Sequence, residues 1–471
     1  MNIQSKNLTF LFLALGLIQC YQATGQKLKT LRHSEILNMR LEYDKQVLKI
    51  KGAQIPIGIS VIVSNNSRQT TKGFSKGNLR WSNFKISVDS AQYSNGKIII
   101  PSYRNMPEAI TVTITSKYDP KQTFKDIIIL NKLTDIKILP VITGSVSPGN
   151  KFKVGGKATF DNGTINNYAS LNSSILSLLD LRMNVTGGQL SNGTVRLSEN
   201  IDDFPDHSVY ISAFSNKNSR VADSLKVMLD YKKKYIFRES GFSGFNGFSG
   251  SNGSDGGTGK NGCMGSQGQD GGNGSDGDDL DVFADAYFDS ILLTKLIYVE
   301  IFNINRQTTK KYLINPEGGS IYIESAGGNG GSGGNGGNGG NGGNGEPGKK
   351  FVKEIKDSTC TRTIVKYGPG CNGGNGGDGG CGGYGGDGGD GGNIFVHYTT
   401  AAKPYLQFIR VESEGGDYGK GGSGGNSGTP GTGGSGDPNG TNGRSGNSGQ
   451  RGYDGYSGNW GNVSYEEVIA E

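Results

Sequence analysis

The chain has 471 residues, of which 82 are glycine and 19% are charged, and its formal net charge at pH 7 is +6. So small a charge over this length excludes the strongly basic surface typical of nucleic acid binding. The three histidines, His33, His207 and His397, are each more than 170 residues apart, which does not favour a catalytic base. We therefore expect no enzyme, no cofactor and no metal site, although a glycosidase with two carboxylates stays open.

The N-terminus has the pattern of a secretory signal peptide. Lys6 precedes an apolar stretch, Leu8 to Ile18, that is too short to span a bilayer. Small residues before Gln26 predict cleavage after Gly25, so residues 1–25 are removed. Lipidation at Cys20 is the alternative, but Gln19 stands where such sites need a small residue. We expect a secreted or cell-surface protein that does not span a membrane, with the periplasm as the other compartment.

Residues after the signal peptide have the pattern of β-strands. Ile110 to Thr115 alternates apolar and polar side chains, as a half-buried strand does. Ser94-Asn95-Gly96-Lys97 and Ser191-Asn192-Gly193-Thr194 are hairpin-turn sequences. Helix signals are nearly absent, so we predict two immunoglobulin-like β-sandwiches, at 30–132 and 133–235.

Glycine then recurs at every third position in four blocks, at 241–277, 327–348, 370–391 and 416–461, where 44 of 45 such positions are glycine. A period of three matches the polyproline II helix, which lines up every third residue on one side. That helix makes no internal hydrogen bonds, so a buried one must pair with neighbouring backbones. The blocks predict packed glycine helices, against the alternatives of a flexible linker or a collagen-like trimer.

In the second and third blocks the triplets read Gly-Gly-Asn or Gly-Gly-Asp. Two of the three faces of each helix therefore carry no side chains, and we call these faces bare. The two blocks are therefore predicted to lie inside the bundle, and turns are expected at Asp437-Pro438-Asn439 and at Thr258 to Asn261. These turns make about six helices. The structural glycines predicted to face neighbouring backbones are Gly327, Gly330, Gly333, Gly336, Gly339, Gly373, Gly376, Gly379, Gly382 and Gly385.

The order of strands and glycine blocks resembles a known family. The resemblance covers about residues 280–471 and rests on the strand Ile321–Glu324 before Ser325-Ala326-Gly327, on Gly368-Pro369-Gly370, on the strand Ile394–Tyr398, on Phe408–Glu412 and on Asn462–Tyr465. This region is similar to the glycine-rich N-terminal domain of the Obg GTPases. The resemblance implies a fold only, a small β-barrel with six glycine helices, because the GTPase domain is absent. The predicted fold of 241–471 is therefore a glycine-helix bundle with β-strands, in an all-β chain.

Four cysteines, Cys263, Cys360, Cys371 and Cys381, remain after the signal peptide. An even number in an oxidising compartment predicts disulfides. Cys371 and Cys381 would lie about 31 Å apart on a straight helix, which predicts that each pairs with Cys263 or Cys360. The acidic run Asp276, Asp278, Asp279 and Asp281 is interpreted as a solvated edge, with an oxygen-ligand cation site as the alternative.

Aromatic residues in the glycine blocks are candidate contact residues. Phe242, Phe245 and Phe248 share one face at a period of three, and we expect them to pack on the barrel or on the preceding sandwich. A contact with a partner is the other interpretation. Tyr384, Tyr453, Tyr456 and Trp460 suit sugar stacking but also suit capping of the bundle.

These patterns together indicate a secreted, non-catalytic bacterial surface protein whose rigid glycine head serves adhesion or structural assembly. Its expected partner is a cell-surface or extracellular polymer or protein. The alternatives are a glycan- or ice-binding module and a collagen-like trimer.

Overall fold

A computed structural model describes residues 28–102, 106–358 and 360–469. The described chain is predominantly β, which confirms the all-β prediction. It forms two compact units. The first comprises the described residues up to Thr143 with Lys151–Leu197 and Ser208–Val227, and the second comprises Gly144–Asn150, Ser198–His207 and the chain from Met228. The predicted signal peptide and Cys20 lie outside the described residues.

The first unit contains two pairs of antiparallel sheets. In the earlier pair, a five-stranded sheet and a three-stranded sheet share one core that includes Ile55, Ile59 and Val112. The strands are β1 (Ile36–Tyr43), β2 (Gln54–Val63), β3 (Arg68–Thr70), β5 (Gln92–Ser94) and β6 (Lys97–Ile99), against β4 (Phe84–Val88), β7 (Ala109–Ser116) and β8 (Thr123–Ile129), with η1 (Trp81–Asn83). The strand predicted at 110–115 lies within β7, where every second residue is buried.

The later pair has the same division into five and three strands. Its core joins Ile136 and Phe160 of the larger sheet to Leu181 of the smaller one. The elements are β9 (Leu133–Val141), β10 (Lys151–Phe160), β11 (Ile165–Tyr168), β13 (Gly188–Ser191) and β14 (Thr194–Leu197), against β12 (Leu181–Thr186), β15 (Ser208–Ser215) and β16 (Ala222–Met228), with α2 (Ser173–Leu178).

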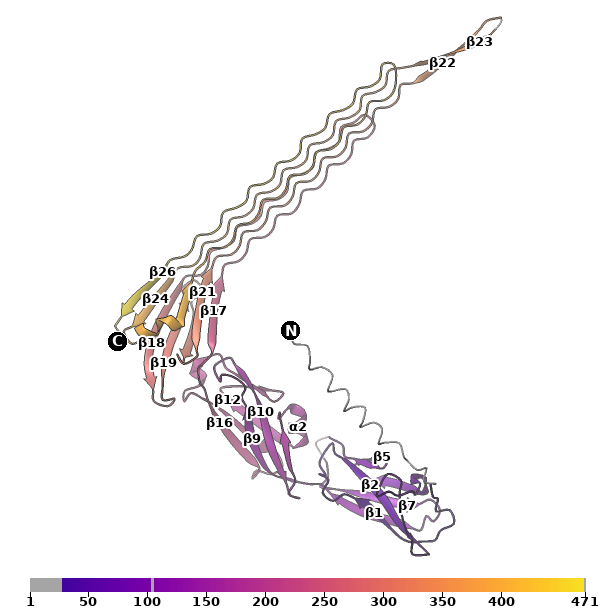
Figure 1. Ribbon diagram of the computed structural model, residues 1–471, viewed down its shortest axis with the longest axis vertical. Coiled ribbons are helices and arrows are strands. Elements are labelled where there is room, and N and C mark those ends of the chain that lie inside the picture. The colour runs from indigo at the N-terminus through magenta and orange to yellow at the C-terminus, as the bar shows by residue number, and fades with distance from the viewer. Residues whose placement is uncertain (1–27, 103–105, 359, 470–471) are drawn as a thin grey trace, which may run out of the picture. The chain divides into compact units, whose positions relative to one another are not determined.

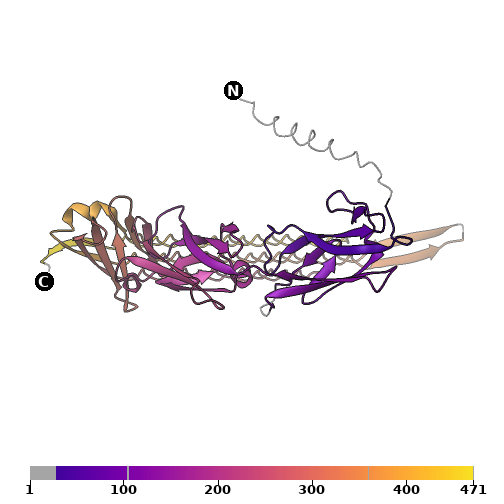
Figure 2. The same ribbon diagram turned by 90° about the horizontal axis from the view of Figure 1, so that it is seen from below.

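The second unit has two sheets around one further core. A parallel sheet has the order β17-β21-β25, and a mixed sheet has the order β20-β19-β18-β24-β26, in which β18, β24 and β26 are parallel neighbours. Figure 2 shows the yellow C-terminal strand β26 beside the orange strands. The elements are η2 (Ile201–Asp203), β17 (Lys234–Ser240), β18 (Leu280–Asp289), β19 (Thr294–Asn303), β20 (Thr308–Ile314), β21 (Ser320–Ala326), β24 (Ile394–Thr399), η3 (Lys403–Phe408), β25 (Ile409–Glu412) and β26 (Val463–Val468).

Six glycine-rich segments, here called arms 1 to 6, extend from these two sheets (Figure 1). The arms comprise residues 241–257, 262–277, 327–348, 370–391, 416–436 and 440–461, in chain order. Arms 1, 3 and 5 follow β17, β21 and β25, and arms 2, 4 and 6 lead into β18, β24 and β26. We call arms 1, 3 and 5 the outgoing layer and arms 2, 4 and 6 the returning layer. The order of parallel strands in each sheet is therefore continued as the order of arms in each layer.

The arms are joined by backbone hydrogen bonds that repeat every third residue. In arm 3, Gly336 N–H donates to Ser423 of arm 5, and Gly337 N–H donates to Ser266 of arm 2. Arm 3 also accepts from arm 1 and arm 4, so four other arms surround it. Arm 4 is likewise bonded to arms 2, 3, 5 and 6. The two blocks with two bare faces are thus the two interior arms.

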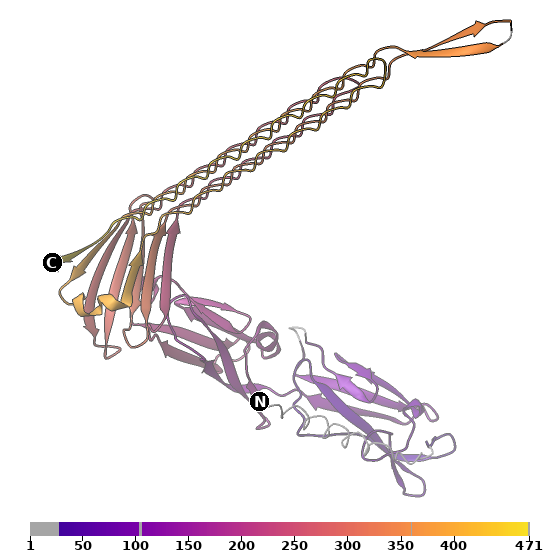
Figure 3. The ribbon, with the colours of Figure 1, turned by 45° about the horizontal axis from the view of Figure 1, so that its top comes forward.

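The chain reverses where turns were predicted. Residues 258 and 259 form a turn between arms 1 and 2, with Gly259 at φ +67°. Residues 436–438 bend between arms 5 and 6. Arms 3 and 4 are joined instead by a two-stranded hairpin, β22 (Lys350–Lys356) and β23 (Thr361–Tyr367), which Figure 3 shows beyond the ends of the arms.

A single glycine tests this packing. A Cβ added at Gly336 would lie 1.9 Å from the carbonyl oxygen of Gly380, whereas one added at Gly257 would meet nothing within 4 Å. We expect Gly336→Ala to destabilise the head by about 2 kcal/mol or more, because separating two backbones leaves buried groups unpaired. Gly257→Ala is the matched control and should change the free energy of unfolding by less than about 1 kcal/mol. Equal effects in thermal melts would contradict the packed arms.

Candidate functional site

The outward residues of the arms form side-chain ladders as well as backbone ladders. In the outgoing layer, Asn338 Oδ1 accepts from the backbone N–H of Asn426, and Asn252 Oδ1 accepts from that of Asn338. The same contact recurs from arm 1 to arm 3 and from arm 3 to arm 5. Its other acceptors in this layer are Asn246, Asp255, Asn329, Asn335, Asn341 and Asn344.

The returning layer repeats this contact with more carboxylates. Asp387 Oδ1 accepts from Tyr456 N–H, and Asp270 Oδ1 accepts from Tyr384 N–H. Its other acceptors are Asn261, Asn273, Asp276, Asn372, Asn375, Asp378 and Asp390. The outward face of this layer is therefore acidic, whereas asparagine predominates in the outgoing layer.

The ladder explains the composition of the triplets. Two glycine N–H groups in each turn of an interior arm donate to neighbouring backbones, and the outward N–H has no backbone acceptor in the pattern. A short side chain with an oxygen three bonds from Cα can reach across to that group, as Asn and Asp do in turns and caps. The triplet spacing in the sequence does not by itself reveal this contact.

The aromatic residues are exposed. Phe242, Phe245 and Phe248 are 81%, 64% and 79% exposed, so the expectation that they pack on the sheets at the base of the arms is wrong. They lie along arm 1 at the edge of the bundle. Trp460 is also exposed. In the returning layer, the rings of Tyr384 and Tyr453 stack with centroids 5.8 Å apart and an interplanar angle of 22°.

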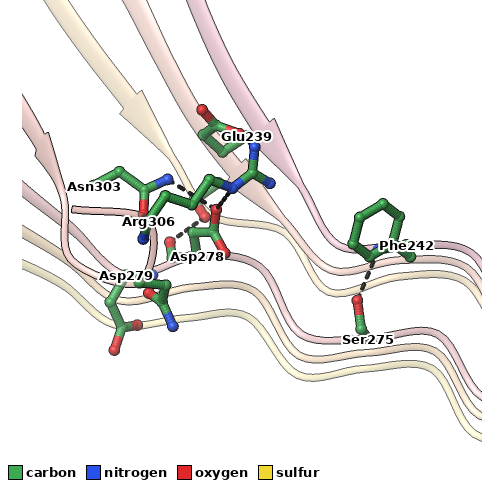
Figure 4. Close-up of polar contacts among 9 residues, drawn as sticks. Glu239, Phe242, Ser275, Asp278, Asp279, Asn303 and Arg306 are labelled. Atoms are coloured by element: carbon green, nitrogen blue, oxygen red, sulfur yellow. Dashed lines mark hydrogen bonds and ion pairs between the residues drawn. The ribbon is translucent and has the colours of Figure 1, made fainter. Parts of the chain in front are cut away.

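Both edges of the bundle carry side chains that cap backbone N–H groups. On the side of arms 5 and 6, Asp454 accepts from Gly421 N–H and Asn442 accepts from Gly433 N–H. The bond from Gly421 lowers the pKa of the Asp454 carboxyl. On the side of arms 1 and 2, Ser275 Oγ accepts from Phe242 N–H (Figure 4). Such caps occupy groups that another backbone could otherwise pair with.

The acidic run at the base of arm 2 is occupied by protein donors. Figure 4 shows Arg306 between Glu239 and Asp278, with Nη1 2.8 Å from the Glu239 carboxylate and Nε 2.6 Å from that of Asp278. Asn303 Nδ2 also donates to Asp278, and Asp279 accepts from Asn393 N–H. These contacts fix the junction between the arms and the two sheets of the second unit, and they do not favour the cation site.

The four cysteines are free thiols, and three of them are exposed. The ladder between arms 2 and 4 pairs Asn261 with Asn375, which places Cys263 level with residue 377. Cys371 and Cys381 are then about 19 Å and about 12 Å away along the arms at roughly 3.1 Å per residue. A disulfide needs Cα atoms within about 7 Å. The structure therefore does not support the expected cross-links of Cys263 to arm 4.

The hairpin of β22 and β23 presents an exposed surface between arms 3 and 4. Phe351, Val352, Ile355, Val365 and Tyr367 are exposed. Residues 349–367 contain six Lys or Arg and two Asp or Glu. The signal available from sequence was this combination of apolar and basic residues between two glycine blocks that contain no Lys or Arg.

Two histidines have carboxylate partners, which sequence spacing did not show. His207 Nε2 lies 2.8 Å from Asp289, and its Nδ1 lies 2.9 Å from the hydroxyl of Tyr231. Burial raises the pKa of Tyr231, so the hydroxyl stays protonated. His397 lies 3.4 Å from both Asp281 and Glu466. The His207 contacts are buried and hold the loop before β15 against the β18–β19 turn, a structural role.

Within the described ranges, no three His, Cys, Asp or Glu side chains are grouped as metal ligands. The described part of the chain also contains no helix of the length and apolarity needed to cross a bilayer. A scan against protein-family models finds no match to this chain, and a search of curated proteins finds no significant match.

The side-chain ladder predicts that two asparagines at the same level of the outgoing layer contribute differently to the stability of the head. Asn338→Ala removes the acceptor of Asn426 N–H, and we expect a loss of about 1 kcal/mol, the net worth of one hydrogen bond. Asn426 belongs to arm 5, the last arm of its layer, so Asn426→Ala removes no ladder acceptor and should change stability by less than half as much. Chemical denaturation of both variants measures this. Indistinguishable midpoints would contradict a stabilising ladder.

Proposed function

We propose that this chain is a secreted or surface-exposed, non-catalytic protein of adhesion or structural assembly, in which the arms form a rigid head. The observation that carries the proposal is the hydrogen-bond pattern at every third residue across all six arms. Ordering glycine is costly in backbone entropy. Dense pairing between backbones is the interaction that can offset this cost, and it gives a stiff scaffold.

The three-residue repeat supports polyproline II geometry for the arms, since that helix has three residues per turn. The sheet pairs of the first unit support two immunoglobulin-like sandwiches, whose role would be spacing or recognition. The resemblance to the glycine-rich domain of the Obg GTPases concerns the arms and the barrel below them. It bears on fold alone.

A collagen-like trimer is the competing assembly. The bonds of the arms lie within one chain, and side chains cap both edges. We therefore predict that the chain from Gln26 sediments as a monomer and melts at a temperature independent of protein concentration. A trimer, or a melting temperature that rises with concentration, would favour the collagen-like alternative.

Deletion variants test the function in the source organism. A strain without the gene should attach poorly to surfaces or to neighbouring cells, and the intact gene should restore attachment. Deleting Asn338 alone turns the rest of arm 3 by a third of a turn, so that side chains enter the packed faces. A gene with this deletion should therefore not restore attachment. Deleting Gly336-Gly337-Asn338 keeps the phase and should restore more attachment.

Antibody labelling of intact cells measures whether each variant reaches the surface. Unchanged attachment in the deletion strain, or a protein found only in the cytoplasm, would contradict the proposed function.

A further inference from the structure

We propose that the outward face of the returning layer carries a glycan-binding platform made by Tyr384, Tyr453 and Tyr456, with neutral polysaccharides as its ligands. This inference rests on the proposed adhesive function and names the ligand class of the head.

The first observation is a break in the ladder. The outward positions of arm 4 between residues 372 and 390 are Asn or Asp, except Cys381 and Tyr384. A tyrosine has no side-chain carbonyl oxygen, so Tyr384 gives up the cap that an Asn or Asp would supply to Tyr453 N–H. Local rules of a fold are most often broken where a residue has another role. The packing of arm 4 does not require an aromatic ring at this position.

The second observation is the geometry of the rings. Tyr384 and Tyr453 belong to different arms, yet their rings stack at 5.8 Å while remaining 54% and 78% exposed. Tyr456 is one triplet along arm 6, about 9 Å further at roughly 3.1 Å per residue, and it is 81% exposed. The rings thus lie along the arms at a spacing comparable to a disaccharide unit. Exposed aromatic rings grouped in this way mark contact sites.

The third observation is the polar surroundings. Asp270 and Asp387 each use Oδ1 to hold the backbone of Tyr384 and Tyr456, so both carboxylates lie beside the rings, and each has a second oxygen that can accept from ligand hydroxyls. Gln450 is one triplet before Tyr453. The rings can stack on the apolar face of a pyranose, and the carboxylates can accept hydrogen bonds from its hydroxyls. This combination matches a sugar. The same carboxylates repel acidic polysaccharides and nucleic acids.

The outgoing layer supplies an internal comparison. Its outward positions carry Asn, Ser, Thr, Asp, Lys and Pro and no aromatic residue. The same ladder stabilises both layers, and the outgoing layer has it without aromatic residues at its outward positions. The tyrosines of the returning layer are therefore not needed for stability. A binding platform on one face also suits a head that contacts a polymer through a single layer of arms.

The test is affinity electrophoresis of the chain from Gln26 in gels containing β-glucan, mannan or soluble chitin oligomers, with alginate as an acidic comparison. We expect retardation by at least one neutral polysaccharide and none by alginate. Tyr453→Ala should weaken binding roughly tenfold, because an aromatic contact is lost. Phe245→Ala, which removes an exposed ring from arm 1, is the matched control and should bind like the unaltered protein.

Melting temperatures within experimental error of the unaltered protein show that both variants are folded. No retardation by any neutral polysaccharide, equal binding by all three proteins, or selective retention of alginate or of a quaternary ammonium resin would overturn the inference. Attachment of cells tests the proposed function separately. Cells that attach through a head that binds no neutral polysaccharide would refute the platform and leave the adhesive function standing.

Discussion

Every triplet of an interior arm presents three backbone N–H groups, and the packing of the head depends on how they are paired. Two groups belong to glycines and reach carbonyl oxygens of other arms, as Gly336 and Gly337 do. The third belongs to the outward residue, and at many triplets an Asn or Asp side chain of the neighbouring arm accepts from it, as at Asn338. The repeat of two glycines and one short polar residue follows from this requirement.

The sheets of the second unit decide which arms are neighbours. Parallel pairing of β17, β21 and β25 places three outgoing arms in order, and β18, β24 and β26 do the same for the returning arms. A backbone without side chains has little means of choosing its partner or its register. The strands supply that information through buried residues such as Ile323 and Val396, whose packing fixes where each arm begins.

Much of this fold could be predicted from the sequence, because glycine phase and turn chemistry are local signals. The turns near Gly259 and Pro438 and the interior place of arms 3 and 4 are of this kind. The ladder from Asn338 to Asn426 could not be predicted, since it depends on the register between arms 88 residues apart. Register also separates Cys263 from its expected partners. The exposure of Phe245 was missed because a triplet pattern does not say which arms form an edge.

The hairpin between arms 3 and 4 lies outside the lattice that holds the arms. The last bonds to arms 5 and 6 link Gly348 to Ser435 and Gly368 to Asp437, and residues 350–367 follow beyond them. Exchange of this segment would leave every ladder contact of the arms in place. The tip can therefore change in sequence without altering the packing of the arms, and a foreign hairpin or loop could be grafted there for display at the far end of the head.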